Sequence, residues 1–208
     1  MPSTPEIVDL GRAGYESTRE SMLRWVAEAR KDEVGGKVVL VEHDAVYTAG
    51  RATPPEQLDE DTIPVERGGR ITYHGPGQLV VYPILRIPGR DVRGWLRRLE
   101  ALGVAVCAHF GLDAEPSVDG TGVFVGGKKV VSIGVAVRHW VSMHGLSINV
   151  DMDLSAFQRI RPCGLDPDVM TDLSQLVGHA VSMQDAKDAV KAHLALLTAP
   201  TTAPRSPS

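Results

Sequence analysis

The stretch GVFVGGKKVVSIGVAVRHWVSMHGLSINV, residues 122–150, decides the fold of this chain. It holds three runs rich in β-branched residues, at 122–125, 129–137 and 140–150, and a diglycine turn separates the first two. Apolar runs bounded by turn residues are typical of consecutive strands in one sheet. We therefore expect a strand-rich centre.

Further strands and helices flank this centre. KVVLVEH (37–43) and LVVYPIL (79–85) are typical of buried strands. Apolar spacing and capping residues predict four helices. They cover 15–30, 92–110 behind an Asp91 N-cap, 167–177 between Asp166 and Gly178, and about 182–197. Helices around a strand-rich middle predict an α/β (α+β) domain on one sheet.

Length and composition fit one globular unit. The chain has 208 residues, 43% hydrophobic and 23% charged, which is usual for a protein with a buried core. No linker or internal repeat divides residues 1–197, so we expect a single domain there. The segment TAPTTAPRSPS (198–208) has no apolar face to bury, and we expect it to be disordered.

Charge and hydropathy exclude several classes of function. The 22 basic and 26 acidic residues give a net charge of -4, which argues against nonspecific nucleic-acid binding. No apolar run approaches the roughly 20 residues that span a bilayer, and residues 1–16 lack the features of a signal peptide. Two dissimilar cysteines do not suggest disulfides, so we expect a cytoplasmic protein without membrane contact.

The segment RGGRITYHGPGQ (67–78) is the most unusual part of the chain. Its four glycines and one proline suit neither a helix nor an ordinary strand. Glycine lets the backbone approach a ligand closely, so we interpret the segment as a wall of a binding site. It contains neither GxxxxGK[ST] nor a strand-linked GxGxxG, and phosphate binding is therefore not indicated.

Cys163 is the candidate nucleophile. Pro162-Cys163-Gly164 forms an irregular turn directly before the helix expected at 167–177, and a helix N-terminus favours a thiolate. Cys107 lies inside the apolar pattern of a predicted helix, and we interpret it as an inert core residue.

A cysteine nucleophile needs a base or cation, and several side chains qualify. His43, His74 and His144 lie at predicted strand ends or glycine-flanked turns, and Lys128 and Lys129 open the strand at 129–137. Sequence spacing alone does not choose among them. Without an H-x-x-x-H or C-x-x-C pair, no metal site is indicated.

Several segments, in order, resemble one family. RGGRITYHGPGQLVVYP (67–83) resembles the signature of the lipoyl(octanoyl) transferases, and EHDAVYTAGR (42–51) is similar to the segment before it. The central strands, RIRPCGL (159–165) and MTDL (170–173) also match. The similarity covers nearly all of residues 10–180.

This resemblance implies a fold and a reaction. The fold is a mixed sheet flanked by helices, as in the catalytic modules of biotin and lipoate protein ligases. The reaction moves an octanoyl group from acyl carrier protein to an enzyme cysteine, and then to a lysine of a lipoyl domain. The acceptors are lipoyl domains of 2-oxoacid dehydrogenases and the glycine-cleavage carrier protein. No cofactor or ATP is implied, and we expect a monomer.

The resemblance also implies roles for residues. Cys163 carries the acyl thioester, and Lys129, or alternatively Lys128, lowers the pKa of its thiol. We add that the N–H of Gly164 helps to stabilise the oxyanion. The acyl pocket is lined by Arg67, Gly68, Gly69, Arg70, Ile71, Thr72, Tyr73, His74, Ser132, Ile133, Gly134, Gly145, Leu146 and Ser147. His74 shapes this wall and forms hydrogen bonds within it.

An acidic carrier protein predicts a basic rim around the site. The candidates for this rim are Arg51, Arg67, Arg70, Arg93 and Arg97. Two alternative functions remain open. One is an ATP-dependent lipoate or biotin ligase of the same fold, and the other is a lipoyl-domain binding module without catalysis.

Overall fold

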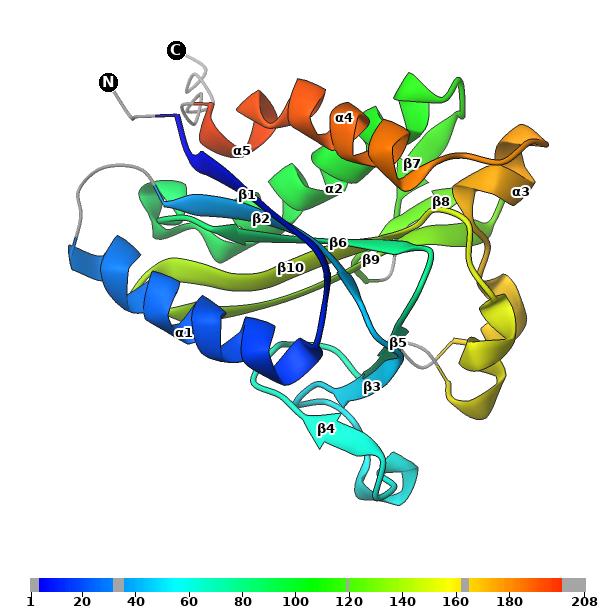
Figure 1. Cartoon of the computed structure of the whole chain (residues 1–208), viewed down its shortest axis with the longest axis horizontal. Helices are drawn as coiled ribbons and strands as arrows, with labels where there is room; N and C mark the ends of the chain where they lie inside the picture. The colour runs from blue at the N-terminus through cyan, green and yellow to red at the C-terminus, as the bar shows by residue number, and fades with distance from the viewer. Residues whose placement is uncertain (1–3, 32–35, 119, 162–164, 200–208) are drawn as a thin grey trace, which may run out of the picture.

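A mixed sheet forms the centre of the computed structural model, which describes residues 4–31, 36–118, 120–161 and 165–199. Within these residues the sheet has seven strands in the order β1-β2-β6-β10-β9-β8-β7 (Figure 1). β1 and β2 run parallel, and the other neighbours in this order run antiparallel. The strands are β1 (Glu6–Ala13), β2 (Lys37–His43), β6 (Gln78–Ile84), β7 (Ala114–Pro116), β8 (Val123–Val125), β9 (Lys128–Arg138) and β10 (Val141–Asn149).

Helices cover both faces of this sheet. The helices α2, α4 and α5 lie on one face, and α1 lies on the other beside a smaller sheet of order β4-β3-β5 (Figure 1). The helices are α1 (Tyr15–Lys31), α2 (Val92–His109), α3 (Leu173–Val177), α4 (Met183–His193) and α5 (Ala195–Thr198). The smaller sheet contains β3 (Val46–Ala49), β4 (Thr62–Pro64) and β5 (Ile71–His74).

Each face of the large sheet has its own apolar core. On the α2 side, a cluster that includes Trp95, Leu99 and Val106 packs against Leu79 and Val81 of β6. On the α1 side, a smaller cluster joins Met22 to the residues of β6 that alternate with these. The alternation of side chains along a strand explains how one central strand serves both cores.

The helix α2 shows why the sequence signals worked. The Asp91 side chain accepts a hydrogen bond from the N–H of Gly94 at 2.9 Å, as expected of an N-cap. Gly111 follows the helix with a φ of 75°, which is the left-handed region that glycine adopts without strain. Cys107 is fully buried in this helix, and burial raises the pKa of its thiol to about 12. The structure therefore confirms a core position for Cys107.

Most predicted elements are confirmed, but the helix expected at about 182–197 is divided into α4 and α5, and two further predictions were wrong. Residues 71–74 form strand β5, although the composition of 67–78 argued against a strand. Residues 167–177 do not form one helix. A 3-10 turn (Pro167–Val169) precedes the short helix α3, whose N-cap is Asp172. The interruption occurs where Met170 pairs with Lys129 of β9, so tertiary pairing overrides the helical signal.

Two further predictions concern the domain and the tail, and the structure tests neither of them. The single domain over 1–197 stays a prediction, and residues 200–208 of the expected tail lie outside the described residues. Among the described helices, none combines the length and the apolar character needed to cross a membrane.

Candidate functional site

A narrow cavity lies between the smaller sheet and the α1 face of the large sheet, and we call it the slot. Its lining residues come from all three segments singled out in the sequence. They are Arg67, Thr72, His74, Val80, Tyr82, Ser132, Ile133, Gly134, His144, Gly145, Leu146 and Ser147. The structure thus brings the glycine-rich segment together with the middle of β9 and β10.

Strand register arranges the floor of the slot in rows. Ser147 of β10 is paired with Ser132 of β9 on one side and with Val80 of β6 on the other. Two residues along β9, Gly134 faces Gly145 across the ladder. Because paired residues share a face of the sheet, these rows point to the same cavity.

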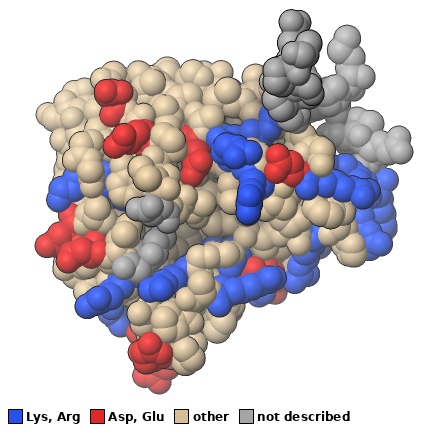
Figure 2. Space-filling view, turned by 180° about the vertical axis from the view of Figure 1, so that it is seen from behind, with Lys and Arg blue, Asp and Glu red and all other residues tan. Residues whose placement is uncertain are grey.

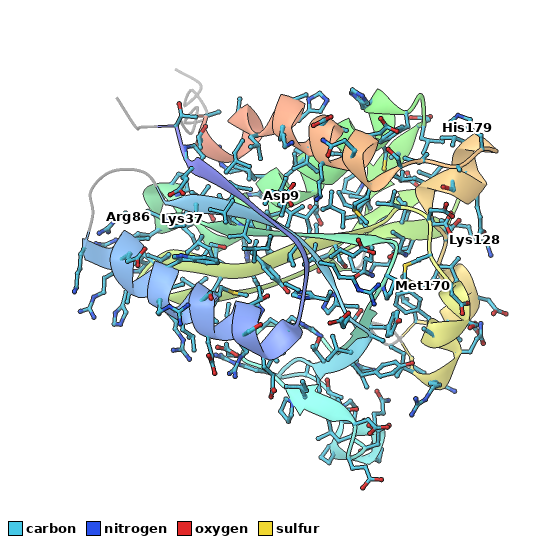
Figure 3. The ribbon with its side chains drawn as sticks, viewed as in Figure 1. Asp9, Lys37, Arg86, Lys128, Met170 and His179 are labelled. Atoms are coloured by element: carbon cyan, nitrogen blue, oxygen red, sulfur yellow. The ribbon has the colours of Figure 1, made fainter. Side chains whose placement is uncertain are left out.

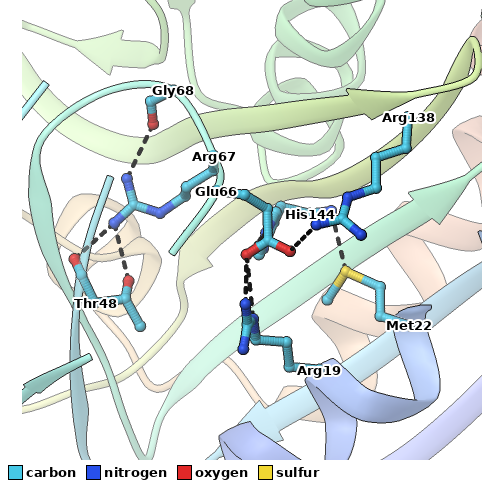
Figure 4. Close-up of polar contacts among 8 residues, drawn as sticks. All are labelled: Arg19, Met22, Thr48, Glu66, Arg67, Gly68, Arg138 and His144. Atoms are coloured by element: carbon cyan, nitrogen blue, oxygen red, sulfur yellow. Dashed lines mark hydrogen bonds and ion pairs between the residues drawn. The ribbon is translucent and has the colours of Figure 1, made fainter. Parts of the chain in front are cut away.

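Arg67 forms part of the opposite wall and is 7% exposed. Its guanidinium donates hydrogen bonds to the carbonyl and hydroxyl oxygens of Thr48 at 2.7 and 2.9 Å and to the carbonyl oxygen of Gly68 (Figure 4). It also donates to the carbonyl oxygen of Arg70. The N–H of Gly68 donates to the carbonyl of Val135 on β9 at 2.9 Å. Arg67 therefore holds the 67–70 loop in place, and its assignment to a surface basic rim was wrong.

The strand β5 divides its residues between two sides. Thr72 and His74 face the slot, whereas Tyr73 packs in a separate apolar cluster with Phe157 and Met170. Among the other expected pocket residues, Gly68 and Ile71 do not line the slot. Gly69 and Arg70 line a second, wider cavity instead.

This second cavity, which we call the groove, contains Lys129. It shares Arg67 and Ile133 with the slot, so the two cavities meet at these residues. The groove is lined by Ala52, Arg67, Gly69, Arg70, Glu115, Pro116, Ser117, Val118, Gly120, Thr121, Phe124, Gly127, Lys129, Ile133 and Leu165.

Lys129 is a buried cation at the side of the groove. It is 2% exposed, and its Nζ donates to the carbonyl of Thr121 at 3.2 Å and lies 5.6 Å from the centre of the Phe124 ring. A Cβ on Gly122 would lie 2.7 Å from Lys129 Cε, so glycine makes room for this side chain. Lys128 is exposed and donates instead to the carbonyl of Asp168 at 2.8 Å.

The segment that follows Cys163 is attached to the same end of β9. The N–H of Thr171 donates to the Lys129 carbonyl at 3.0 Å, and Met170 pairs with Lys129. Lys128 and Met170 lie at one end of the molecule in Figure 3. Pro162, Cys163 and Gly164 lie outside the described residues, whereas Leu165 lines the groove.

A chain of buried hydrogen bonds joins His74 to this segment. His74 Nδ1 lies 2.7 Å from Gln78 Oε1, Gln78 Nε2 donates to Asn149 Oδ1 at 2.9 Å, and Asn149 Nδ2 donates to the Thr171 carbonyl at 2.8 Å. The Thr171 carbonyl can only accept, so Asn149 donates its amide N–H there and accepts from Gln78 through Oδ1. Gln78 Oε1 must then accept a hydrogen bond from His74. His74 therefore carries its proton on Nδ1. Burial, followed by the proximity of His43, lowers the pKa of His74 to about 3.

His144 lies inside β10 and not at a strand end, contrary to the sequence-based expectation. Its φ is 61°, a left-handed conformation that is strained for histidine. Its N–H donates to Met22 Sδ at 3.2 Å, and its Nε2 lies 3.7 Å from Glu66 Oε2 (Figure 4). Burial lowers the pKa of His144, so the ring is neutral.

Glu66 lies between His144, which lines the slot, and Arg19 of α1. Arg19 donates to its Oε2 from Nη2 at 2.9 Å and from Nε at 3.1 Å, and Arg138 Nη2 lies 3.5 Å from Oε1. The neighbouring His144 and Arg19 hold the pKa of Glu66 well below its usual range. This network ties α1 to the loop that carries Arg67.

With this geometry described, comparisons with known proteins are informative. The profile of the lipoyl protein ligase A/B catalytic domain matches residues 17–195. An octanoyltransferase of Salinispora tropica is 42% identical over 95% of this chain and 99% of its own length. One from Syntrophotalea carbinolica is 43% identical over 90% and 92%. This chain belongs to the octanoyltransferase family.

Family membership confirms the resemblance seen in the sequence. It also confirms the expectation that this chain is an acyltransferase. Solved structures support the expected fold. Lipoate-protein ligase A bound with ATP has a TM-score of 0.74 at 18% identity, covering 100% of this chain and 90% of that chain. A biotin protein ligase from Aquifex aeolicus, in complex with biotin and ATP, has a TM-score of 0.56 at 13% identity, covering 93% and 70%. At such identities, these neighbours show the fold alone.

Sequence reasoning missed several residues that line the slot or support it. Val80 and Tyr82 line the slot from β6, and alternation along the predicted strand 79–85 placed both on one face. Gln78 and Asn149 had no such signal, because each was a polar residue at a strand end.

Proposed function

We propose that this chain transfers an octanoyl group from acyl carrier protein to a lysine of a lipoyl domain through a thioester on Cys163. The observation that carries the proposal is the pair of adjoining cavities that share Arg67 and Ile133, in which a buried lysine lines the wide groove and the surface of the slot is mostly apolar. Family membership supplies the reaction class. The two carriers and the thioester are parts of our proposal.

In the first step, the Cys163 thiolate attacks the carbonyl carbon of the octanoyl thioester. The new C–S bond forms on the enzyme, the C–S bond to the carrier arm breaks, and the departing thiolate takes a proton. Lys129 is the cation we assign to the stabilisation of the Cys163 thiolate. In support, Leu165, two residues beyond Cys163 in the sequence, lines the groove together with Lys129.

In the second step, the ε-amine of the acceptor lysine attacks the acyl-enzyme. A C–N bond forms, the C–S bond breaks, the Cys163 thiolate is regenerated, and the proton lost by the amine passes to solvent. Exchange between thioesters is nearly balanced and amide formation is downhill, so ATP is not needed. The acyl chain lies in the slot during both steps, and the N–H of Gly164 is our candidate oxyanion donor.

The proposed partners fit the surface only in part. Arg51, Arg70, Arg93 and Arg97 are exposed and stay candidates for docking an acidic carrier. Figure 2 shows Lys and Arg side chains in several groups with acidic side chains among them. We also propose that the enzyme is a monomer and acts in the cytoplasm.

A Cys163→Ala variant tests the proposed intermediate. Wild-type protein incubated with octanoyl-acyl carrier protein should gain the mass of one octanoyl group, and Cys163→Ala should gain none. Cys107→Ala is the matched control and should still be acylated, because Cys107 is fully buried. An octanoyl adduct that persists on Cys163→Ala would overturn the assignment.

The two adjacent lysines allow a matched comparison. We expect Lys129→Met to raise the pKa of the Cys163 thiol by about one unit or more, because the thiolate loses a nearby cation. Lys128→Met should leave that pKa close to the wild-type value, since the Lys128 ammonium is bound to the Asp168 carbonyl. The rate of alkylation by iodoacetamide as a function of pH measures both. Equal curves for wild type and Lys129→Met would remove Lys129 from this role.

The ligase alternative differs in its need for ATP. Under our proposal, octanoyl transfer to a lipoyl domain proceeds at the same rate in the presence of an ATP-hydrolysing enzyme. Transfer that requires ATP and survives in Cys163→Ala would favour the ligase. Absence of transfer from a folded wild-type protein, together with binding to a lipoyl domain, would favour the non-catalytic module.

A further inference from the structure

We propose that Thr121 and Phe124 hold the ammonium of Lys129 in the position from which it acts, so that both are positioning residues for the transferase. Together with Gly122, which lies between them in the sequence, they form what we call the cradle. Neither residue supplies a reacting atom, and each acts through Lys129. This inference rests on the proposed function, because it assumes that Lys129 stabilises the Cys163 thiolate.

Strand pairing places Phe124 beside Lys129. In the ladder between β8 and β9, Phe124 is the partner of Lys129. The ammonium nitrogen lies 5.6 Å from the centre of the Phe124 ring, and both residues line the groove. The attraction between a cation and a ring face is strongest where water is excluded, and Lys129 is 2% exposed. The ring therefore restrains the ammonium on this side.

Thr121 holds the tip of the lysine side chain from the segment that precedes β8. Its carbonyl accepts a hydrogen bond from Lys129 Nζ at 3.2 Å, and its hydroxyl donates to the carbonyl of Ile133 at 3.0 Å. Ile133 belongs to β9, the strand that also carries Lys129. The carbonyl that receives the ammonium is thus fixed relative to the strand from which the lysine extends.

Gly122 brings its backbone against the stem of the lysine side chain. A Cβ at this position would lie 2.7 Å from Lys129 Cε and 2.7 Å from the Val131 carbonyl oxygen. The φ of Gly122 is 136°, a conformation that favours glycine, and its carbonyl accepts from the N–H of Ser117 at 2.9 Å. The stem of Lys129 therefore has little room for another rotamer.

The cradle leaves the charge of Lys129 directed at the groove. A lysine ammonium has three N–H donors. Within the described parts of the chain, the Thr121 carbonyl is the one hydrogen-bond acceptor of Lys129. A long side chain without such contacts would spread over several rotamers, and its effect on a neighbouring thiolate would be weaker.

A Thr121→Val variant tests the proposal, because it removes the hydroxyl and keeps the branched shape of the side chain. The rate of alkylation of Cys163 by iodoacetamide as a function of pH, followed by mass spectrometry of peptides, gives the thiol pKa. We expect Thr121→Val to raise this pKa by about half a unit, since the ammonium is held less firmly. Thr121→Ser keeps the hydroxyl and should restore the wild-type value. Thr198→Val is the control at a residue of α5 that does not line the groove.

The same substitution in a Lys129→Met background separates positioning from a general effect on the groove. There Thr121→Val should change the thiol pKa no further, because it acts through the ammonium. Phe124→Leu removes the ring face and should also raise the pKa only where Lys129 is present. It serves as the second variant if Thr121→Val does not fold by circular dichroism.

The outcomes distinguish the cradle from the proposed function. A Lys129→Met protein that titrates like the wild type would overturn the role of Lys129, and the cradle with it. A shifted Lys129→Met, together with folded Thr121→Val and Phe124→Leu proteins that titrate like the wild type, would overturn only the cradle. Equal shifts from Thr121→Val with and without Lys129 would also overturn only the cradle, since the effect would then not pass through the ammonium.

Discussion

His74 shows how one buried residue links substrate binding to stability. Its ring lines the slot, and its Nδ1–H is committed to Gln78. Tyr15 stacks on the ring at 6.3 Å between centres, and His43 lies 6.1 Å away. Protonation would place a charge among these groups, and burial therefore lowers the pKa of His74 to about 3.

This lowered pKa predicts a loss of stability in acid. In the unfolded chain His74 binds a proton below about pH 6.5, whereas in the folded protein it does so only below about 3. Its contribution is therefore fully present above about 6.5 and falls as the pH drops toward 3, by up to about 1.4 kcal/mol per unit. His74→Gln should make the free energy of unfolding less dependent on pH between 7 and 5.

Urea denaturation at several pH values measures this slope. His179→Gln is the control, because His179 is exposed and its replacement should leave the slope unchanged. A wild-type slope retained in a folded His74→Gln protein would show that other groups, such as the buried His43 and His144, dominate the acid response.

At the scale of elements, one hydrogen-bonded chain connects parts of the molecule that are far apart in the sequence. Gln78 begins β6, Asn149 ends β10, and Thr171 precedes α3. Their side chains and backbone join the slot wall at His74 to the start of β9 at Lys129. These contacts hold the segment after Cys163 beside the groove.

Replacement of Asn149 should lower the stability of the fold. Asn149→Ala leaves the Gln78 amide and the Thr171 carbonyl without their buried partner, at a cost of about 2–3 kcal/mol. We expect urea denaturation to show this loss. Gln184→Ala is the control, since Gln184 makes its hydrogen bond to Asp188 on an exposed surface and should cost less than about 0.5 kcal/mol. A loss below about 1 kcal/mol for Asn149→Ala would contradict a structural role for the chain of bonds.

At the scale of the whole molecule, the large sheet lies between the slot and most of the main core, although Ile133 and Leu146 belong to that core and also line the slot. The slot lies on the α1 face, and the cluster around Trp95 and Leu99 lies on the other. Substitutions in that core should therefore change stability without changing the chemistry of the folded enzyme.

Leu99→Ala tests this separation. Loss of this fully buried side chain should lower the free energy of unfolding by about 2–5 kcal/mol. The rate of octanoyl transfer per folded molecule, measured well below the melting temperature, should stay within about twofold of wild type. A larger fall in the rate of the folded variant would mean that the two faces are coupled.

Local signals were sufficient for much of this fold. The strands at 37–43, 79–85 and 122–150 were predictable, because burial imposes regular apolar patterns on them. The helix after Asp91 was predictable from its cap and its stripe. The strand β1 and the smaller sheet were not foreseen, since β1 is largely exposed and β3 and β5 are short. Such strands are stabilised by pairing with residues that are distant in the sequence.

The sequence by itself determined the family, the sheet and the residues that carry the proposed chemistry. Motif order and hydrophobic periodicity are local properties, so they can be read from the residues without the structure. Tertiary structure decided which side of each strand faces the slot, why Arg67 is buried, and that Lys129 and not Lys128 lines the groove. It also decided the positions of Tyr82 and His144. These depend on strand register and on contacts between distant segments, which no local pattern encodes.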